Sequence, residues 1–160
     1  MVNILPIMGL AEMTGKLALA FLLGGIVGLE RERRDRPAGI RTHIIVCMGS
    51  TLIALVSIEM AGPQGDHTRI AAQIVSGIGF LGAGTIFRAG TAVRGLTTAA
   101  GLWVVAGIGM GVAVGGNMQV LACITAILVF ATNMWVRILE DRLVRPRRDR
   151  SEERRVGKEC

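Results

Sequence analysis

The hydrophobic positions of this chain gather into five long runs, each bounded by charged residues, a proline or a glycine-rich turn. A helix needs about 20 mostly apolar residues to cross a bilayer core of about 30 Å, and roughly 17 still suffice. All five runs reach that length, so the pattern predicts an all-α fold, a polytopic bundle of transmembrane helices. The expected spans are residues 13–29, 44–61, 70–87, 96–114 and 118–138.

The connections between the runs are short, which makes neighbouring helices antiparallel within one bundle. Only residues 115–117 join the last two runs, and this predicts a tight helical hairpin. We therefore expect one transmembrane domain over residues 1–143 and a basic cytoplasmic tail over 144–149. Residues 150–160, RSEERRVGKEC, are similar to the translation of a common sequencing adapter and are left out of the functional reading, although a charged natural tail is the alternative.

Basic residues predict the orientation of the helices, because Lys and Arg are enriched in the cytoplasmic loops of membrane proteins. Thirteen arginines follow the first, third and fifth runs, all on one side of the expected bundle. The other side has Arg69 and Lys16, and Lys16 can pair with Glu12 one turn earlier and extend outward. This asymmetry predicts an N-terminus outside the cytoplasm and a C-terminus inside.

Composition narrows the class of protein further. Hydrophobic residues make up 51% of the chain and aromatic residues only 4%, with 22 glycines, a mixture typical of closely packed membrane helices. The net charge of +6 does not indicate nucleic-acid binding, because the arginines flank apolar runs and few aromatic rings are present to stack on bases. Because no zinc spacing, cofactor motif or catalytic arrangement is present, we expect neither a cofactor nor an enzyme.

The sequence SGIGFLGAGT places Gly77, Gly79 and Gly82 at the spacing of a dinucleotide-binding turn. Such a turn needs a preceding strand and a carboxylate about 20 residues later, whereas no Asp or Glu occurs between Asp66 and Glu140. The surrounding run is also long enough to form one membrane helix. We therefore disfavour a nucleotide site, and close helix packing or a broken helix that lines a substrate path are the alternatives.

Small residues form stripes on three of the expected helices. Two such stripes on the third helix predict that it contacts neighbours on both sides, at the centre of the bundle, and that Gly79→Leu disrupts the bundle. The expected packing positions are Gly24, Gly28, Gln73, Ser76, Gly77, Gly79, Gly82, Ala83, Gly84, Gly107 and Gly111.

Polar residues cluster where the first, second and fourth spans should meet the cytoplasmic surface. The candidate cluster is Glu30, Arg41, Thr42, His43, Arg94, Thr97 and Thr98. Because the fourth span begins there, its free backbone N–H groups and its dipole favour an anion or a carboxylate nearby. The cluster is either an interfacial network of salt bridges and helix caps, or a site for a partner or a small ion.

Three carboxylates are weak candidates for binding magnesium: Glu30, and on the opposite side Glu59 and Asp66. Magnesium keeps several waters and needs only one or two carboxylates from the protein, so this small number does not exclude a site. A solvated loop is the alternative for Glu59 and Asp66. We therefore assign no metal site from the sequence.

Four blocks, GGIVGLERE, AGIRTH, SGIGFLGAG and RGLTTAAGLW, occur in this order, and together they resemble the membrane domain of the MgtC/SapB family. The resemblance covers roughly residues 10 to 140. The signature positions are occupied here by Glu30, Arg41, Thr42, Gly79, Gly82, Arg94, Gly95, Thr97 and Thr98. Many members of the family continue into a soluble C-terminal domain.

The resemblance implies a multi-pass protein of the bacterial inner membrane with a regulatory role in acclimation to low magnesium and, in pathogens, in survival inside host cells. It also implies contacts with other membrane proteins, such as the ATP synthase or transporters, and with the lipid bilayer; a homodimer is a further expectation. The alternative function is a component of a transporter or channel for Mg²⁺ or another small ion. Gln73 is the only strongly polar side chain expected at mid-membrane depth, which favours the regulatory role, because ion pathways usually contain more ionisable groups.

Overall fold

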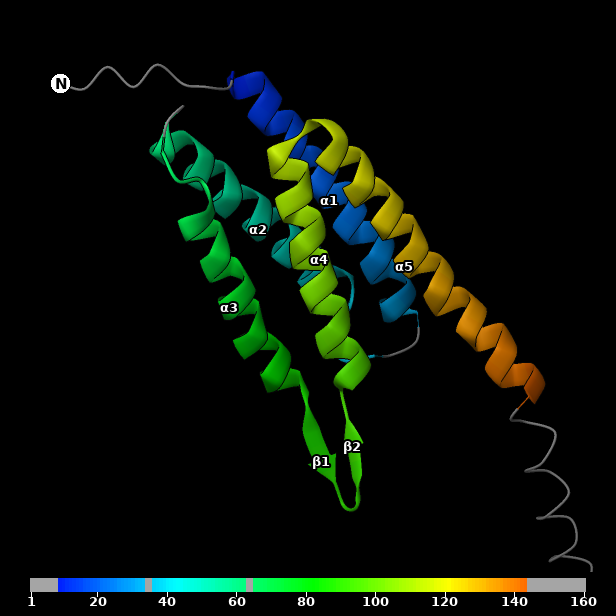
Figure 1. Ribbon diagram of the computed structural model, residues 1–160. Coiled ribbons are helices and arrows are strands. Elements are labelled where there is room, and N and C mark those ends of the chain that lie inside the picture. The colour runs from blue at the N-terminus through cyan, green and yellow to red at the C-terminus, as the bar shows by residue number, and fades with distance from the viewer. Residues whose placement is uncertain (1–8, 34–35, 63–64, 144–160) are drawn as a thin grey trace, which may run out of the picture.

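The computed structural model describes residues 9–33, 36–62 and 65–143, and the side chains up to residue 136. The predicted tails, 144–149 and 150–160, lie outside these residues. Within them the chain forms five helices and one β-hairpin (Figure 1): α1 (Leu10–Glu32), α2 (Ile40–Ala61), α3 (Thr68–Thr85), β1 (Phe87–Ala89), β2 (Ala92–Arg94), α4 (Leu96–Val114) and α5 (Gly116–Leu143). The predicted helical bundle is therefore confirmed.

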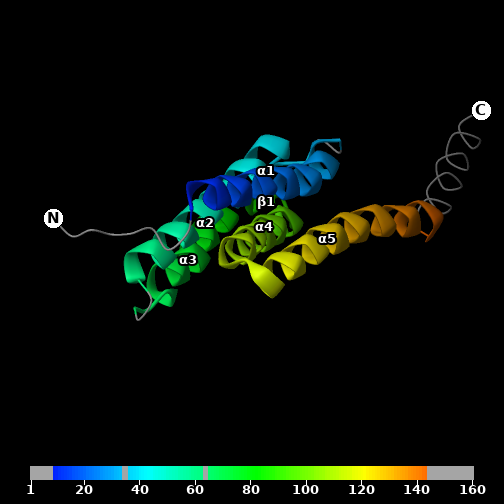
Figure 2. The ribbon, with the colours of Figure 1, turned by 90° about the horizontal axis from the view of Figure 1, so that it is seen from above.

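Helix α4 is the centre of the bundle. It contacts all four other helices, and Figure 2 shows it between α3 and α5, with α1 and α2 on its other side. One core cluster joins α1, α2, α4 and α5 around Val27, Cys47 and Val105. A second joins α2, α3 and α4 around Leu55, Ile78 and Ala106.

Four of the five described helices are long and apolar enough to cross a membrane: α1, α2, α4 and residues 116–136 of α5. Helix α3 is not among them, since Arg69, Gln73 and the six Gly, Ser or Thr residues from Ser76 to Thr85 lower its hydropathy. Large apolar side chains such as Phe80, Ile127 and Leu128 are exposed on the outside of the bundle. That surface suits lipid rather than water, whereas the orientation and a full crossing by α3 stay predictions.

The placement of α3 at the centre of the bundle was wrong. Helix α3 lies at the edge and packs only on α4 and α2 among the larger helix contacts. Its buried residues are Ile74, Ile78 and Gly82, which form one narrow stripe. The other predicted packing positions of α3 are exposed: Gln73, Ser76, Gly77, Gly79, Ala83 and Gly84. A Cβ added at any of its three exposed glycines would meet nothing within 4 Å. Small side chains permit close contact on any face, but only a neighbouring helix creates it.

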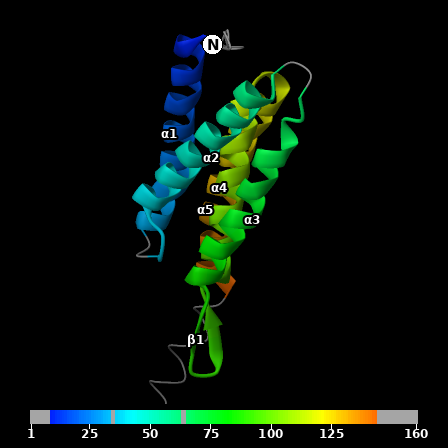
Figure 3. The ribbon, with the colours of Figure 1, turned by 90° about the vertical axis from the view of Figure 1, so that its left-hand side faces the viewer.

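The β-hairpin between α3 and α4 was not predicted, because Ile86 and Phe87 prolong the apolar run of the third helix. The helix instead ends at Thr85, and Phe87 pairs with Arg94 across two antiparallel strands. Gly90 opens the two-residue turn with a φ of 62°, a backbone angle that such tight hairpin turns favour. Figure 3 shows that the hairpin extends beyond the helix ends on one side of the bundle.

Lys16 joins α1 to the C-terminal end of α4. Its ammonium donates to the Ala113 carbonyl oxygen at 3.0 Å and pairs with Glu12 at 3.1 Å, as the i,i+4 spacing predicted. The side chain is buried rather than extended outward, because the last carbonyls of α4 attract a cation.

We expect Lys16→Met to lower the free energy of unfolding by about 1–2 kcal/mol, since the apolar stem stays while the bond to the α4 carbonyl is lost. Glu12→Gln is the matched control and should cost less than about 0.5 kcal/mol, because Glu12 is exposed. Titration of unfolding with SDS in mixed micelles measures both values. Equal costs for the two variants would contradict a role for the α4 contact.

Candidate functional site

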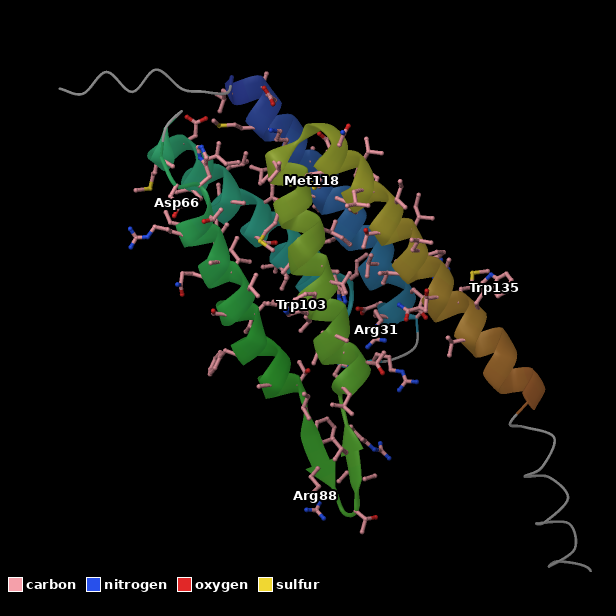
Figure 4. All side chains as sticks on the ribbon, viewed as in Figure 1. Arg31, Asp66, Arg88, Trp103, Met118 and Trp135 are labelled. Carbon is pink, nitrogen blue, oxygen red and sulfur yellow. The ribbon has the colours of Figure 1, made fainter. Side chains whose placement is uncertain are left out.

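Four polar side chains are buried together where the end of α1 meets the beginnings of α2 and α4. They are Glu30 and Arg31 from α1, His43 from α2 and Thr98 from α4, with exposed fractions of 8%, 6%, 0% and 3%. Figure 4 shows Arg31 at the end of α1, close to α4. We name these four residues the polar junction.

A direct hydrogen bond connects α1 to α4 at this junction. Arg31 donates from Nη2 to the Thr98 hydroxyl oxygen over 2.8 Å, and both side chains are buried. Thr98 lies in the first turn of α4, where backbone N–H groups are unsatisfied by the helix itself. The bond therefore fixes the start of α4 against the end of α1.

His43 fills the space between α1 and α4 from the first turn of α2. Its Nδ1–H donates to the Gly39 carbonyl oxygen at 2.9 Å, and its ring faces Gly101 of α4. Its Nε2 has no hydrogen-bond partner among the described residues, so a buried acceptor remains at the centre of the junction.

Glycines bring the three helices of the junction into backbone contact. A Cβ added at Gly24 would lie 2.8 Å from the His43 carbonyl oxygen, and one at Gly28 would lie 2.7 Å from the Ile40 Cα. Between α4 and α2, a Cβ at Gly109 would lie 2.4 Å from the Cys47 carbonyl oxygen. Thr51 adds a hydrogen bond to the Gly109 carbonyl oxygen at 2.9 Å.

The remaining predicted glycines have different surroundings. Gly111 approaches Ala122 of α5, and Gly82 approaches Ala99 of α4 at an ordinary distance, whereas a Cβ on Gly107 would meet nothing within 4 Å. Gly109 was missed, although it lies between two predicted glycines of α4. Residues two apart on a helix point in different directions, so Gly107, Gly109 and Gly111 face different neighbours. Only the position of α2 shows which of these glycines it contacts.

The structure brings together only part of the predicted polar cluster. Glu30, His43 and Thr98 are in the polar junction, whereas Arg41, Thr42, Arg94 and Thr97 are exposed. Arg41 and Thr42 were expected before the second helix but belong to its first turn, because α2 already begins at Ile40. Arg94 ends strand β2, outside the helices.

Arg31 was missed by the sequence reading of the cluster. A signal was available, because Gly24, Gly28 and Arg31 follow the i, i+4, i+7 spacing of a single helix face. The face that packs against α2 through glycine thus ends in a buried guanidinium. Arg31 was used only as a basic residue that predicts orientation, so its place on the packing face was not recognised.

On the opposite side of the bundle, Glu59 is half-buried and Asp66 is exposed in the connection to α3. Among the described residues, His, Cys, Asp and Glu nowhere form a group of three that could hold a metal ion. Asp66 has a different role, because its Oδ1 accepts hydrogen bonds from the backbone N–H of Thr68 at 2.8 Å and from the Thr68 hydroxyl at 2.5 Å. These bonds to the ionised carboxylate lower the pKa of Asp66 below its ordinary value.

We expect this lowered pKa to make the turn before α3 sensitive to acid. A depressed folded pKa stabilises the native turn above the unfolded pKa of about 3.9, and the contribution is lost as pH falls through the lower folded value. In detergent micelles, the amide NMR signal of Thr68 should titrate with a midpoint below about 3.9. Asp66→Asn should abolish that titration; a wild-type midpoint at or above about 3.9 would contradict the predicted effect.

A helical bundle with lipid-suited outer faces, backbone-close glycine contacts and a buried polar junction at one end defines a polytopic membrane protein. Residues 17–142 match the model of the MgtC family. The chain belongs to this family, as the four ordered blocks indicated.

Individual proteins that are similar to this chain agree with the assignment to the family. Protein MgtC of Brucella abortus (strain 2308) is 46% identical over 130 residues, 81% of this chain and 53% of that protein. Protein SapB of Bacillus subtilis (strain 168) is 41% identical over 80 residues, 46% of this chain and 34% of that protein. The putative magnesium transporter YhiD of Escherichia coli (strain K12) is 43% identical over 83 residues, 48% of this chain and 39% of that protein. The chain spans about half the length of the Brucella relative, and no solved structure matches it.

Proposed function

We propose that this chain is a regulatory protein of the bacterial inner membrane that supports growth when magnesium is scarce, and that it acts through contacts with other membrane proteins. Membership of the MgtC family supports this role, and the name of the Escherichia coli relative, which calls it a magnesium transporter, supports a connection with magnesium. In a pathogen the same role would support survival inside host cells. The partners to examine first are the ATP synthase, transporters and a second copy of this chain.

The observation that best supports contact-based regulation is the closeness of α1, α2 and α4. Backbone contacts at Gly24 and Gly28 close the space between α1 and α2, and the contact at Gly109 closes the space between α2 and α4. A magnesium ion usually keeps several of its waters, and these closed contacts offer no room for such a hydrated ion. The exposed apolar faces of α3 and α5, in contrast, are available to other membrane proteins.

Crosslinking in living cells tests the proposal. A photoreactive residue at the exposed Ile127 of α5 should capture a defined membrane protein when magnesium is low, whereas one at the buried neighbour Ala126 should not. The host should lack its own gene of this family, so that growth at low magnesium depends on the introduced chain. Growth that persists unchanged after deletion of the captured protein would contradict regulation through that contact.

The alternative, a component of a magnesium transporter, is favoured by the name given to the Escherichia coli relative. It predicts that purified protein in liposomes admits Mg²⁺ faster than protein-free liposomes do. It also predicts that Glu30→Gln or Glu59→Gln reduces this entry. That pair of results would replace the regulatory proposal with transport.

A further inference from the structure

The β-hairpin places two cationic side chains outside the helical bundle. Arg88 and Arg94 are exposed, and Figure 4 shows Arg88 toward the end of the hairpin that lies farthest from the helices. Arg88 donates from Nε to the Gly90 carbonyl oxygen at 3.0 Å, a bond that leaves its charge uncompensated. In the part of the chain that the structure describes, neither guanidinium has a carboxylate within ion-pair distance, and the sequence has no Asp or Glu from 67 to 139.

Exposed apolar side chains lie beside these charges, and the smallest of them lie next to the turn of the hairpin. Ile86 and Leu96, next to the helix ends, are 38% and 60% exposed; Phe87, opposite Arg94, is 50% exposed; Val93, opposite Arg88, is 56% exposed. The small residues Ala89 and Ala92 form the last pair before the turn. Large apolar side chains thus lie at the base and middle of the hairpin, and only small apolar side chains lie next to its turn.

The base of the hairpin is held firmly against the bundle. Gly95 has a φ of 93°, and a Cβ there would lie within 2 Å of the Thr85 carbonyl oxygen, so the chain entering α4 lies directly on the chain leaving α3. This close approach fixes the two strands relative to the helices. The position of the guanidiniums therefore follows from the position of the bundle in the membrane.

The depth of the hairpin can be estimated from helix length. Helix α4 has 19 residues and a length of about 28 Å at 1.5 Å per residue, close to the thickness of the hydrocarbon core. Its first residue thus lies near one boundary of the core, and each strand residue adds about 3.3 Å beyond it. The headgroup layer is only about 5–7 Å thick on each side. Phe87 and Arg94 therefore fall at the outer edge of this layer, about 7 Å beyond the core. Arg88 falls about 10 Å beyond the core, from where its long side chain can extend back to the phosphates.

We propose that the β1–β2 hairpin is a binding element for anionic phospholipid headgroups, with Ile86 and Leu96 at the apolar boundary and Arg88 and Arg94 on lipid phosphates. Charge complementarity supports this occupant, because two guanidiniums without carboxylate partners face a layer of phosphates. Continuity supports it as well, since the apolar base of the hairpin extends the lipid-suited surface of the helices. The binding element holds this end of the bundle in the membrane surface and goes beyond the regulatory role proposed above.

A single tryptophan at position 87 tests this proposal in the full chain. Both natural tryptophans, Trp103 and Trp135, are exposed and are replaced by phenylalanine, and Phe87→Trp then reports on the hairpin. In vesicles of phosphatidylcholine mixed with phosphatidylglycerol, we expect a blue-shifted emission that brominated lipids quench. The shift should weaken in phosphatidylcholine alone. Retention of phosphatidylglycerol by the purified protein should fall roughly fivefold for each arginine removed.

Variants of the same reporter separate the charges of the hairpin from general charge effects. Arg88→Gln with Arg94→Gln should abolish the lipid-dependent shift, and Arg88→Lys with Arg94→Lys should keep most of it. Arg33→Gln with Arg36→Gln removes the same charge from exposed positions near the α1–α2 connection and should leave the shift intact. The proposal would be overturned if the wavelength of the emission depended neither on phosphatidylglycerol nor on the hairpin arginines. So would a reporter that stays in water in these vesicles but becomes shielded in native membranes, since an acidic protein would then be the occupant.

Discussion

Replacing Gly28 by leucine is expected to separate α1 from α2 and to destabilise the bundle by about 3 kcal/mol, since overpacked side chains force the backbone to move. A Cβ at this position would lie 2.7 Å from the Ile40 Cα and 2.9 Å from the His43 Cβ. Neither neighbour can rotate away, because one is backbone and the other is the first atom of a fully buried side chain. Displacement of His43 would also disturb the polar junction.

Gly79→Leu is the matched control, with the same exchange at an open position of α3. A Cβ there would meet nothing within 4 Å, so the variant should be neutral or gain up to about 1 kcal/mol from the better helix propensity of leucine. Unfolding with SDS, followed by circular dichroism, measures both variants. If Gly79→Leu proved as destabilising as Gly28→Leu, the central position predicted for α3 from the sequence would be restored.

The contrast between Gly28 and Gly79 illustrates how far the sequence could predict the fold. Long apolar runs predicted the helices well, because the cost of unpaired backbone groups in lipid leaves few other structures. Helix packing was harder, since a small-residue stripe has the same spacing whether a helix or lipid covers it. Helix α1 has a neighbour along its stripe, and most of the stripe on α3 has none in the single chain.

The ends of the helices were the second feature that could not be predicted from the sequence. Hydropathy places a boundary where apolar residues stop, whereas a helix continues through polar residues as long as its hydrogen bonds do. For this reason α1 continues to Glu32 and includes Arg31, and α2 already starts at Ile40. The hairpin is the opposite case, because apolar Ile86 and Phe87 lie after the helix has ended at Thr85.

The candidate site shows the same division. The sequence grouped Glu30, His43 and Thr98, which the structure buries together, but it could not distinguish Thr97 from its neighbour Thr98. These two residues point about 100° apart on α4, so one faces out of the bundle and the other accepts the bond from Arg31. A sequence motif therefore does not show which of two adjacent residues makes a contact in the structure.

Arg31→Met is expected to have an effect as large as that of Gly28→Leu, about 3–5 kcal/mol, because removing one member of a buried charged network leaves the others uncompensated. The methionine keeps much of the apolar stem, so the loss reports mainly on the guanidinium. Arg33→Met is the matched control and should change the free energy of unfolding by less than about 0.5 kcal/mol, since Arg33 is exposed.

A double-mutant cycle with Thr98→Val assigns the part of this loss that belongs to the bond between Arg31 and Thr98. Thr98→Val alone should cost about 1–3 kcal/mol, because a buried donor of Arg31 loses its acceptor, whereas Thr97→Val should be close to neutral. Each single variant of the cycle removes the same bond, so the double variant should cost less than the sum of the two, by roughly 1 kcal/mol or more. Strict additivity would show that Arg31 stabilises the junction through Glu30 or His43 and not through the start of α4. The cycle therefore decides whether the charge of α1 fixes α4 directly.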